Sequence, residues 1–176
     1  MMLSRDFSGP WQSRAIRDTL QGLFLAELMR PSAELWILSA WVSDVEAIDN
    51  TARSFSAVHP DWPPASIRLT DVMRALVRRG GRLCVVVREV EHNAQFIRTL
   101  HDIQAEMAGQ LGLAISPTAH EKTIVGDEYI FGGSMNLTQS GLTSSEEHVL
   151  LRVDRQVAAS RRLALHGRWG GSLRWR

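Results

Sequence analysis

The sequence predicts a single α/β domain, and three observations lead to this prediction. Its 176 residues match the usual size of one domain, and 44% hydrophobic with 22% charged residues is ordinary for a globular protein. Apolar residues recur at helical spacing over residues 13–30, whereas residues 35–38 form a continuous apolar run typical of a strand buried on both faces. Strand-like and helix-like segments alternate along the rest of the chain, with no internal repeat. We therefore expect one α/β domain over residues 1–176.

Local signals mark where the expected elements begin and end. Pro31 ends the first helix, because proline cannot continue a helix. Thr70 and Asp71 provide the start of a second helix, and the two glycines at 80–81 provide its end. Residues 49–64 contain three prolines and little periodicity, so we expect a long loop there. The other expected elements are strands within 34–42, at 83–87, at 113–116 and at 147–153, two strands within 118–133 joined by a turn at 126–128, helices at 93–108 and from Asp154 to 167, and a short helix from 136.

Composition excludes several classes of protein. The one cysteine, Cys84, lies in an apolar run, so we expect neither a disulfide framework nor a cysteine zinc site. The longest apolar stretches, at 36–42 and 83–87, are far shorter than the roughly 20 residues that cross a bilayer. Residues 1–10 lack the apolar core of a signal peptide. We therefore expect a cytoplasmic protein without a membrane anchor.

Positive charge is distributed unevenly along the chain. There are 19 arginines but a single lysine, Lys122. Residues 152–176 contain seven arginines and one acidic residue, although the net charge of the whole chain is only +1. Because basic side chains interleaved with tryptophans suit a polyanion, we expect this segment to bind nucleic acid. The candidate residues are Arg161, Arg162, Arg168, Arg174 and Arg176.

Two interpretations of the end of this segment, residues 168–176, remain open. If the tail contacts phosphates, its deletion should weaken binding of nucleic acid without unfolding the core. If the tail is a packed helix end or a contact with a partner protein, its deletion should lower thermal stability instead.

A cluster of polar residues surrounds the expected strand pair that precedes the short helix. A period of two places His120 and Lys122 side by side on one face of the first strand. Asp127 follows in the turn, and Ser134 and Asn136 follow the second strand. Imidazole, ammonium, hydroxyl and amide groups together suit a phosphoryl group with its negative oxygens. Because this cluster contains no group of carboxylates, we expect no metal ion and no cofactor.

The order and spacing of these residues resemble the active-site signature of the phospholipase D superfamily. The pattern His120-x-Lys122-x4-Asp127, followed by Ser134-x-Asn136, carries the resemblance. It implies a phospholipase D-like fold, which is a mixed β-sheet flanked by helices on both faces (αβα sandwich). It also implies a phosphodiesterase in which His120 attacks phosphorus and forms a phosphohistidine. Lys122, Ser134 and Asn136 would bind the non-bridging oxygens, and Asp127 would have a structural role in the turn.

The same resemblance implies an assembly and an acidic partner. A second histidine must protonate the leaving oxygen. The signature occurs once and Lys122 is the only lysine, so we expect a homodimer in which two copies of His120 face each other. An acidic residue would hold the other ring nitrogen of His120. Counting from the motif favours Glu146 and the usual pattern favours Glu147, so both remain candidates.

A narrower resemblance is to the small phospholipase D-like proteins of bacterial 7-deazaguanine DNA modification clusters. Residues 38–44, the Asp49-Asn50 pair, residues 91–93 and residues 166–171 carry it. It implies a nuclease or another DNA-processing enzyme, with DNA and other proteins of a DNA modification system as partners. A lipid phosphodiesterase and a non-catalytic dimeric DNA-binding or scaffold subunit are the alternatives.

Several other residues invite a simpler interpretation. We expect Trp36 and Trp41 in the core, and Glu121 facing solvent or forming a dimer contact. The remaining five histidines are expected to be surface or packing residues.

Overall fold

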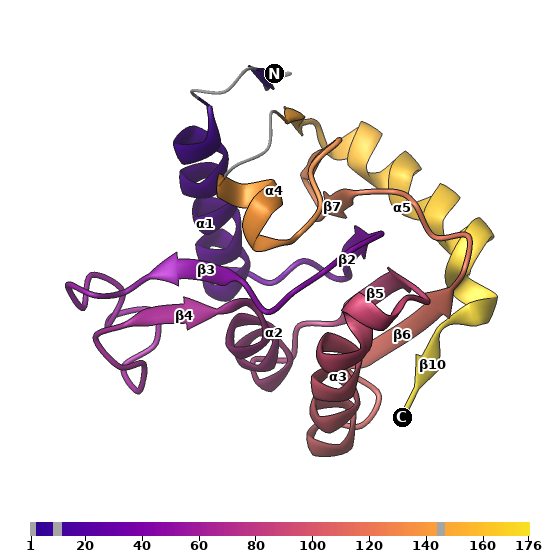
Figure 1. Cartoon of the computed structure of the whole chain (residues 1–176), viewed down its shortest axis with the longest axis horizontal. Coiled ribbons are helices and arrows are strands. Elements are labelled where there is room, and N and C mark those ends of the chain that lie inside the picture. Colours follow the sequence, from indigo (N-terminus) through magenta and orange to yellow (C-terminus); the bar gives the residue numbers. More distant parts are fainter. Residues whose placement is uncertain (1–2, 9–11, 144–146) are drawn as a thin grey trace.

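An eight-stranded mixed sheet runs through the computed structural model, which describes residues 3–8, 12–143 and 147–176 (Figure 1). The strand order is β1-β9-β8-β7-β2-β5-β6-β10. These strands are β1 (Leu3–Ser8), β2 (Leu35–Ser39), β5 (Leu83–Arg88), β6 (Leu111–Ser116), β7 (Thr123–Val125), β8 (Tyr129–Gly133), β9 (His148–Val153) and β10 (Arg174–Trp175). The helices are α1 (Ser13–Met29), α2 (Leu69–Arg78), α3 (Ala94–Glu106), α4 (Gln139–Thr143) and α5 (Arg155–Trp169), with short 3₁₀ turns η1 (Glu91–Asn93) and η2 (Gly170–Ser172).

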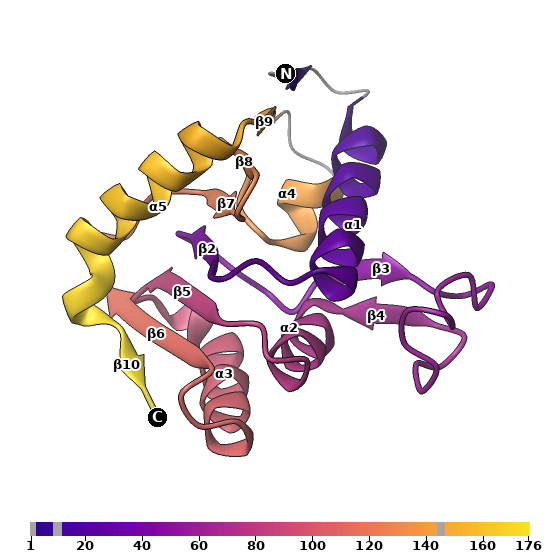
Figure 2. The same cartoon turned by 180° about the vertical axis from the view of Figure 1, so that it is seen from behind.

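Helices cover both faces of this sheet, as Figure 1 and the reverse view in Figure 2 show. Helices α1, α2 and α3 pack on one face, and α5 packs on the other. The sequence of β2 is continuously apolar because both faces of the strand are buried. Leu35 and Ile37 lie in the core that α1, α2 and α3 cover, whereas Trp36 and Leu38 lie in the core under α5. The expected αβα sandwich is confirmed. In the described ranges, no helix combines the length and the apolar character needed to cross a membrane.

Strand directions bring several strand ends to one edge of the sheet. Strands β2, β5 and β6 are parallel, while β7 is antiparallel to both β2 and β8, and β9 is antiparallel to β8. The carboxyl ends of β2, β5, β6 and β8 therefore meet the amino ends of β7 and β9. We call this the motif edge, and it is the place where β2 ends at Ser39 and β7 begins at Thr123.

A separate hairpin projects away from the main sheet (Figure 1). It consists of β3 (Glu46–Asp49) and β4 (Ser66–Arg68), which pair antiparallel. The long loop predicted at 49–64 is present between them, but neither strand was predicted. Each strand buries few side chains, chiefly Ile48 and Ile67, and is too short to show alternation in the sequence.

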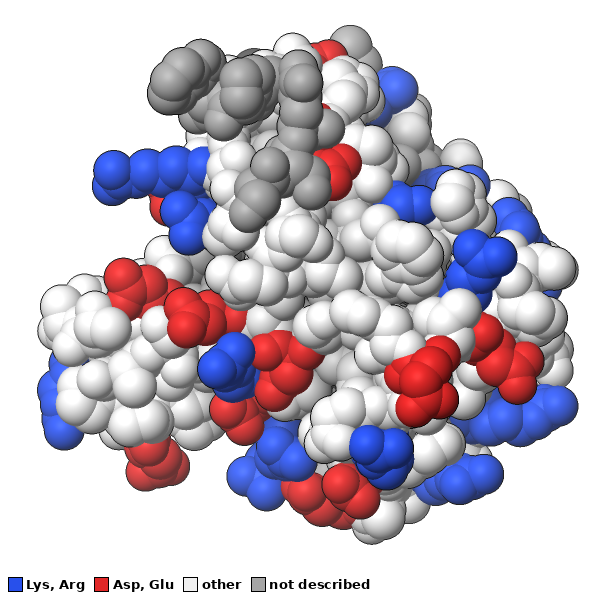
Figure 3. All heavy atoms as spheres, in the orientation of Figure 1, with Lys and Arg blue, Asp and Glu red and all other residues white. Residues whose placement is uncertain are grey.

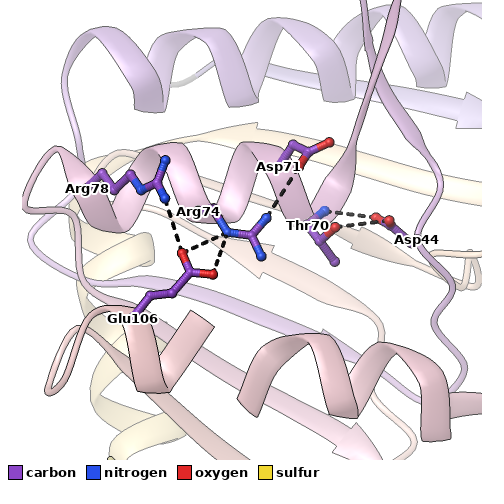
Figure 4. A network of polar contacts seen from close by, with 6 residues as sticks. All are labelled: Asp44, Thr70, Asp71, Arg74, Arg78 and Glu106. Atoms are coloured by element: carbon purple, nitrogen blue, oxygen red, sulfur yellow. Dashed lines mark hydrogen bonds and ion pairs between the residues drawn. The ribbon is translucent and has the colours of Figure 1, made fainter. Parts of the chain in front are cut away.

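A polar network fixes α2 between the segment after β2 and helix α3 (Figure 4). The Asp44 carboxylate accepts from the N–H of Thr70 at 2.9 Å and from its hydroxyl at 3.0 Å. It thereby satisfies a backbone donor in the first turn of α2. Near the end of α3, Glu106 accepts from Nε of Arg74 at 3.0 Å and pairs with Arg78 at 3.2 Å. The segment that leaves β2 is thus tied to the first turn of α2.

Both edge strands come from the ends of the described chain, and neither was predicted from the sequence. Strand β1 pairs with β9, and β10 pairs with β6. Trp169 and Leu173 are buried in the core under α5, and the ring centroid of Trp175 lies 4.1 Å from the Arg82 guanidinium. Residues 169–175 are thus packed against the domain, as the second interpretation of residues 168–176 expects; its effect on thermal stability stays a prediction. The first interpretation, contact of this tail with phosphates, stays a prediction; the burial of Trp169 and Leu173 makes its further expectation, that the tail can be deleted without unfolding the core, less favourable.

Candidate active site

Four motif residues lie at the motif edge, namely His120, Lys122, Ser134 and Asn136, and the first two are in the segment that connects β6 to β7. Strands β5 and β2 lie between these two strands, so residues 117–122 must cross the ends of both. His120 and Lys122 lie in this crossing segment and not on a strand, because the β2–β7 ladder ends at Leu38 and Thr123. The prediction that they share one face of a strand is therefore wrong, although the crossing still brings them to the same edge.

A hydrogen bond connects the side chain of Lys122 to the backbone of His120. The side chain of His120 is exposed, and Nζ of Lys122 donates to the carbonyl oxygen of His120 at 2.8 Å. Partial burial lowers the pKa of Lys122; the carboxylate of Glu147 opposes this shift, and the cation of Arg88 adds to it. The positive charges of Lys122 and Arg88 thus lie in the same part of this edge, which favours an anion there.

Gly132 and Gly133 let the neighbouring strands approach closely. A Cβ on Gly133 would overlap the carbonyl of His148, and a Cβ on Gly132 would lie 2.8 Å from the carbonyl of Lys122. The N–H of Gly133 donates to that same Lys122 carbonyl at 3.1 Å. Any side chain at these positions would force the strands apart, so glycine is needed to bring Ser134 beside the crossing segment.

Ser134 is held by the start of β9. Its N–H donates to the carbonyl of His148 at 2.9 Å, and its Oγ accepts from the N–H of His148 at 2.9 Å. The Ser134 hydroxyl donates to the carboxylate of Glu147, so it must leave this partner before it can donate to a phosphoryl oxygen. Glu146 lies outside the described residues. No side chain in the described part of the chain bonds to the His120 ring, so its pairing with Glu146 or Glu147 stays a prediction.

Asn136 follows β8 and is oriented by the segment after β2. Its Oδ1 accepts from the backbone N–H of Trp41 at 3.1 Å. Its Nδ2 has no hydrogen-bond partner among the described residues, so both of its N–H groups are available to a ligand. The expectation that Trp41 lies in the core is wrong: 50% of its surface is exposed, whereas Trp36 is fully buried. Trp41 lies beyond the end of β2, where the chain leaves the sheet.

A pocket of about 620 Å³ opens beside the motif residues. This volume is within the range of small-molecule binding sites. Its lining combines motif residues, apolar side chains and two arginines, among them His120, Lys122, Ser134, Ile130, Leu150, Val157, Arg152 and Arg161.

Asp127 lies at the opposite edge of the sheet, in the turn between β7 and β8. Its N–H donates to Oγ of Ser32 at 2.8 Å, its Oδ2 accepts from the N–H of Ala33 at 3.0 Å, and its Oδ1 pairs with Arg162 at 3.2 Å. Ser32 in turn donates to Glu27, whose pKa is raised by burial. Asp127 therefore links the turn, the segment before β2 and helix α5, which is a structural position remote from the motif edge.

The other four arginines expected to bind nucleic acid lie in two places. Arg161 and Arg168 of α5 both pair with Glu121, the second at 3.8 Å, so Glu121 is an ion-pair partner within the chain. Arg174 and Arg176 lie on and after β10, at the far edge strand. Of these four, Arg161 lines the pocket. Figure 3 shows basic side chains along the side of the molecule where α5 lies, with acidic side chains beside them.

The sequence analysis did not identify Arg88 as a residue of the site, and it placed Trp41 in the core although its side chain is exposed. Both residues lie at or just beyond the carboxyl ends of parallel strands, where ligands commonly bind in α/β sheets, and this position was the available signal. Across residues 3–8, 12–143 and 147–176, no group of three or more His, Cys, Asp or Glu side chains could hold a metal ion.

Comparison with known families agrees with this fold. A family profile described as cardiolipin synthase, phospholipase D-like domain, matches residues 45–169, which include the whole motif. The match covers more than half of the chain, and the protein therefore belongs to the phospholipase D-like family. A search of curated proteins finds no match.

Solved structures share the fold at low sequence identity. NucT from Helicobacter pylori is similar over 100% of both chains, with a TM-score of 0.64 and 12% identity. Nuc from Salmonella typhimurium, described as a phospholipase D family member, is similar over 100% of this chain and 99% of that one, with a TM-score of 0.61 and 16% identity. TrmBL2, described as an archaeal chromatin protein with a novel mode of DNA binding, is similar over 97% of this chain and 52% of that one, with a TM-score of 0.56 and 15% identity. These similarities confirm the phospholipase D-like fold.

Proposed function

We propose that this protein is a metal-independent phosphodiesterase that cleaves DNA through a phosphohistidine at His120. The observation that carries the proposal is the meeting of His120, Lys122, Ser134 and Asn136 at one edge of the sheet, beside an open pocket. An exposed imidazole supplies a nucleophile, and the ammonium and amide groups supply donors for negative oxygens.

In the proposed reaction, a ring nitrogen of His120 attacks phosphorus, and the bond from phosphorus to the leaving oxygen breaks. A second histidine gives that oxygen its proton. The second histidine then takes a proton from water, whose oxygen attacks phosphorus and breaks the phosphorus–nitrogen bond. Lys122 and Asn136 bind the non-bridging oxygens throughout and contribute most where charge redistributes in the transition state.

The second histidine is proposed to be His120 of another copy of this chain, because the motif occurs once. We expect light scattering at micromolar concentration to give a mass of two chains of 19.7 kDa each. Nuclease activity should persist in EDTA and should fall on dilution as the dimer dissociates. A mass of one chain with full activity would contradict this assembly.

DNA is the proposed substrate, and α5 is its proposed contact beyond the pocket. Arg161 and Arg168 are partly exposed next to the site, although both form ion pairs with Glu121. Arg174 and Arg176 are proposed to contribute less, because β10 lies at the far edge strand. Arg162 has a structural partner in Asp127 and is also proposed to contribute little.

This assignment predicts how DNA binding depends on salt. Replacing Arg161 and Arg168 together with glutamine should reduce the slope of log affinity against log salt by about 0.9 for each phosphate that the protein no longer neutralises. Arg30→Gln is the matched control, because Arg30 is an exposed arginine at the end of α1, away from the motif edge. Fluorescence anisotropy with labelled DNA at several salt concentrations measures both slopes. If the double variant and the control give the same slope, α5 does not contact DNA.

We further propose that the protein works in the cytoplasm with other proteins of a bacterial DNA modification system. The support is the resemblance carried by residues 38–44 and 91–93. Two alternatives have observations in their favour. The likeness to TrmBL2 would suit a non-catalytic DNA-binding subunit, and the apolar side chains of the pocket would suit a lipid phosphodiester. Cleavage of DNA in EDTA, compared with hydrolysis of anionic lipid vesicles, distinguishes all three.

A further inference from the structure

The segment after β2, residues 40–43, is fixed rigidly against the chain that carries Asn136. The hydroxyl of Ser39 donates to the carbonyl of Trp41 at 2.6 Å and accepts from the N–H of Leu137 at 3.1 Å. The N–H of Ser43 donates to the carbonyl of Leu137 at 2.8 Å. Together with the bond from Trp41 to Asn136, these contacts hold the segment from both ends.

The buried side chain of Asn93 forms hydrogen bonds with the same segment. Asn93 is fully buried, and its Oδ1 accepts from the N–H of Val42 at 2.9 Å. Its Nδ2 donates to the carbonyls of Ala40 at 2.9 Å and Arg88 at 2.8 Å. A fully satisfied buried amide of this kind specifies one backbone arrangement. Residues 38–44 and 91–93, which the sequence singled out separately, thus form one structural unit.

This unit presents a single large aromatic side chain to solvent. Among the described residues, six large hydrophobic side chains are exposed, and Trp41 is the only aromatic one of the six. Its indole has no ring or hydrogen-bond partner in the described part of the chain. The backbone of Trp41 is bonded to the side chain of Asn136, so the residue that carries this half-exposed ring is fixed beside Asn136. A half-exposed tryptophan beside an amide that is proposed to bind phosphate has the chemistry of a stacking platform.

We propose that Trp41 stacks on an unpaired nucleobase next to the scissile phosphodiester, and that the substrate is therefore a strand with at least one unstacked base. The proposal rests on the proposed function, because it takes the phosphate-binding role of Asn136 and Lys122 as given. Asn136 joins the two subsites: its Oδ1 accepts from the backbone of Trp41, while its Nδ2 remains available to the phosphate. The neighbouring cations Lys122 and Arg88 favour an anionic chain across this edge.

The test compares binding of a short oligothymidylate with binding of an abasic oligonucleotide of equal length and charge. Binding is measured in the His120→Ala background, so that no turnover interferes. Trp41→Ala should weaken binding of the oligothymidylate by about 10- to 100-fold and leave binding of the abasic strand unchanged. Trp41→Phe, which keeps a ring, should recover most of the affinity. Met29→Ala, which shortens another exposed apolar side chain at the far end of α1, should change neither.

The outcomes separate this inference from the proposed function. If the protein cleaves DNA but Trp41→Ala binds both strands as the parent does, the stacking role is overturned and the phosphodiesterase stands. If Trp41→Ala weakens both strands equally, or Trp41→Phe loses as much as Trp41→Ala, the ring does not stack on a base. If the base-dependent loss is found but no DNA is cleaved, the stacking site stands and the proposed function fails. If Trp41→Ala lowers the melting temperature, the two strands are compared in the protein that retains Trp41. The abasic strand should then bind about 10- to 100-fold more weakly than the oligothymidylate.

Discussion

Replacing His120 with alanine should abolish phosphodiester hydrolysis, with a loss in kcat of at least about 10⁴-fold. The imidazole is the proposed nucleophile, and the substitution in a homodimer also removes the proposed proton donor, which is His120 of the second copy. Lys122→Ala and Asn136→Ala should each cost about 10²- to 10³-fold, because each removes one donor to the developing charge. Steady-state assays on linear DNA in EDTA measure all three.

The matched control for His120→Ala is His59→Ala. His59 is stacked on Trp62 in the loop between β3 and β4, remote from the motif edge. Its replacement should leave kcat within about twofold of the parent, because its ring packs on Trp62 in the hairpin loop and does not lie at the site. If both histidine variants lose activity equally, or if His120→Ala retains it, the assignment of the nucleophile is incorrect.

Deleting residues 168–176 should lower the free energy of unfolding by at least about 4 kcal/mol. The deletion removes Trp169 and Leu173 from the core under α5 and strips β10 from β6. Burying one large apolar side chain contributes about 1.5–3 kcal/mol, and Trp175 packs against Arg82 in addition. Because typical domains are stable by only about 5–15 kcal/mol, the truncated chain should be close to unfolding at 37 °C.

Arg176→Ala provides the control for this deletion. Arg176 contributes its backbone carbonyl to a hydrogen bond with Gly109, and this bond survives the substitution. Urea denaturation should therefore give a change below about 0.5 kcal/mol for Arg176→Ala. A truncated protein with the stability of the full chain would show that the tail is dispensable for the core.

The sequence predicted those parts of the fold whose signals are local. Helix α1 could be recognised from its helical periodicity and strand β2 from its continuous apolar run, and Gly80 and Gly81 marked the end of α2. Strands β1, β3, β4 and β10 escaped prediction because their few buried residues gain meaning only from partners distant in the chain. The orderly spacing of residues 118–125 suggested one strand, but the crossing over β5 and β2 depends on strand order, which a single sequence does not reveal.

The candidate site could likewise be predicted where its residues lie close together in the sequence, and not where they lie far apart. The motif from His120 to Asn136 is compact in sequence, so its chemistry could be anticipated. The orientation of Asn136 depends on Trp41, which is separated from it by 95 positions, and on the buried bonds of Asn93 to residues 40–42. Trp41 was misplaced in the core because an apolar residue after a buried strand resembles a continuation of that strand. Contacts of this range could not be deduced from spacing.

A nucleophilic role of His120 is tested most directly by trapping the covalent intermediate. The purified full-length protein is mixed with a short DNA oligonucleotide in EDTA, quenched in alkaline denaturant to preserve a phosphorus–nitrogen bond, and digested for mass spectrometry. We expect a nucleotide adduct on the peptide that contains His120, and no such adduct in the His120→Ala variant. DNA cleavage that requires Mg²⁺, or that proceeds in the His120→Ala variant, would contradict this role of His120.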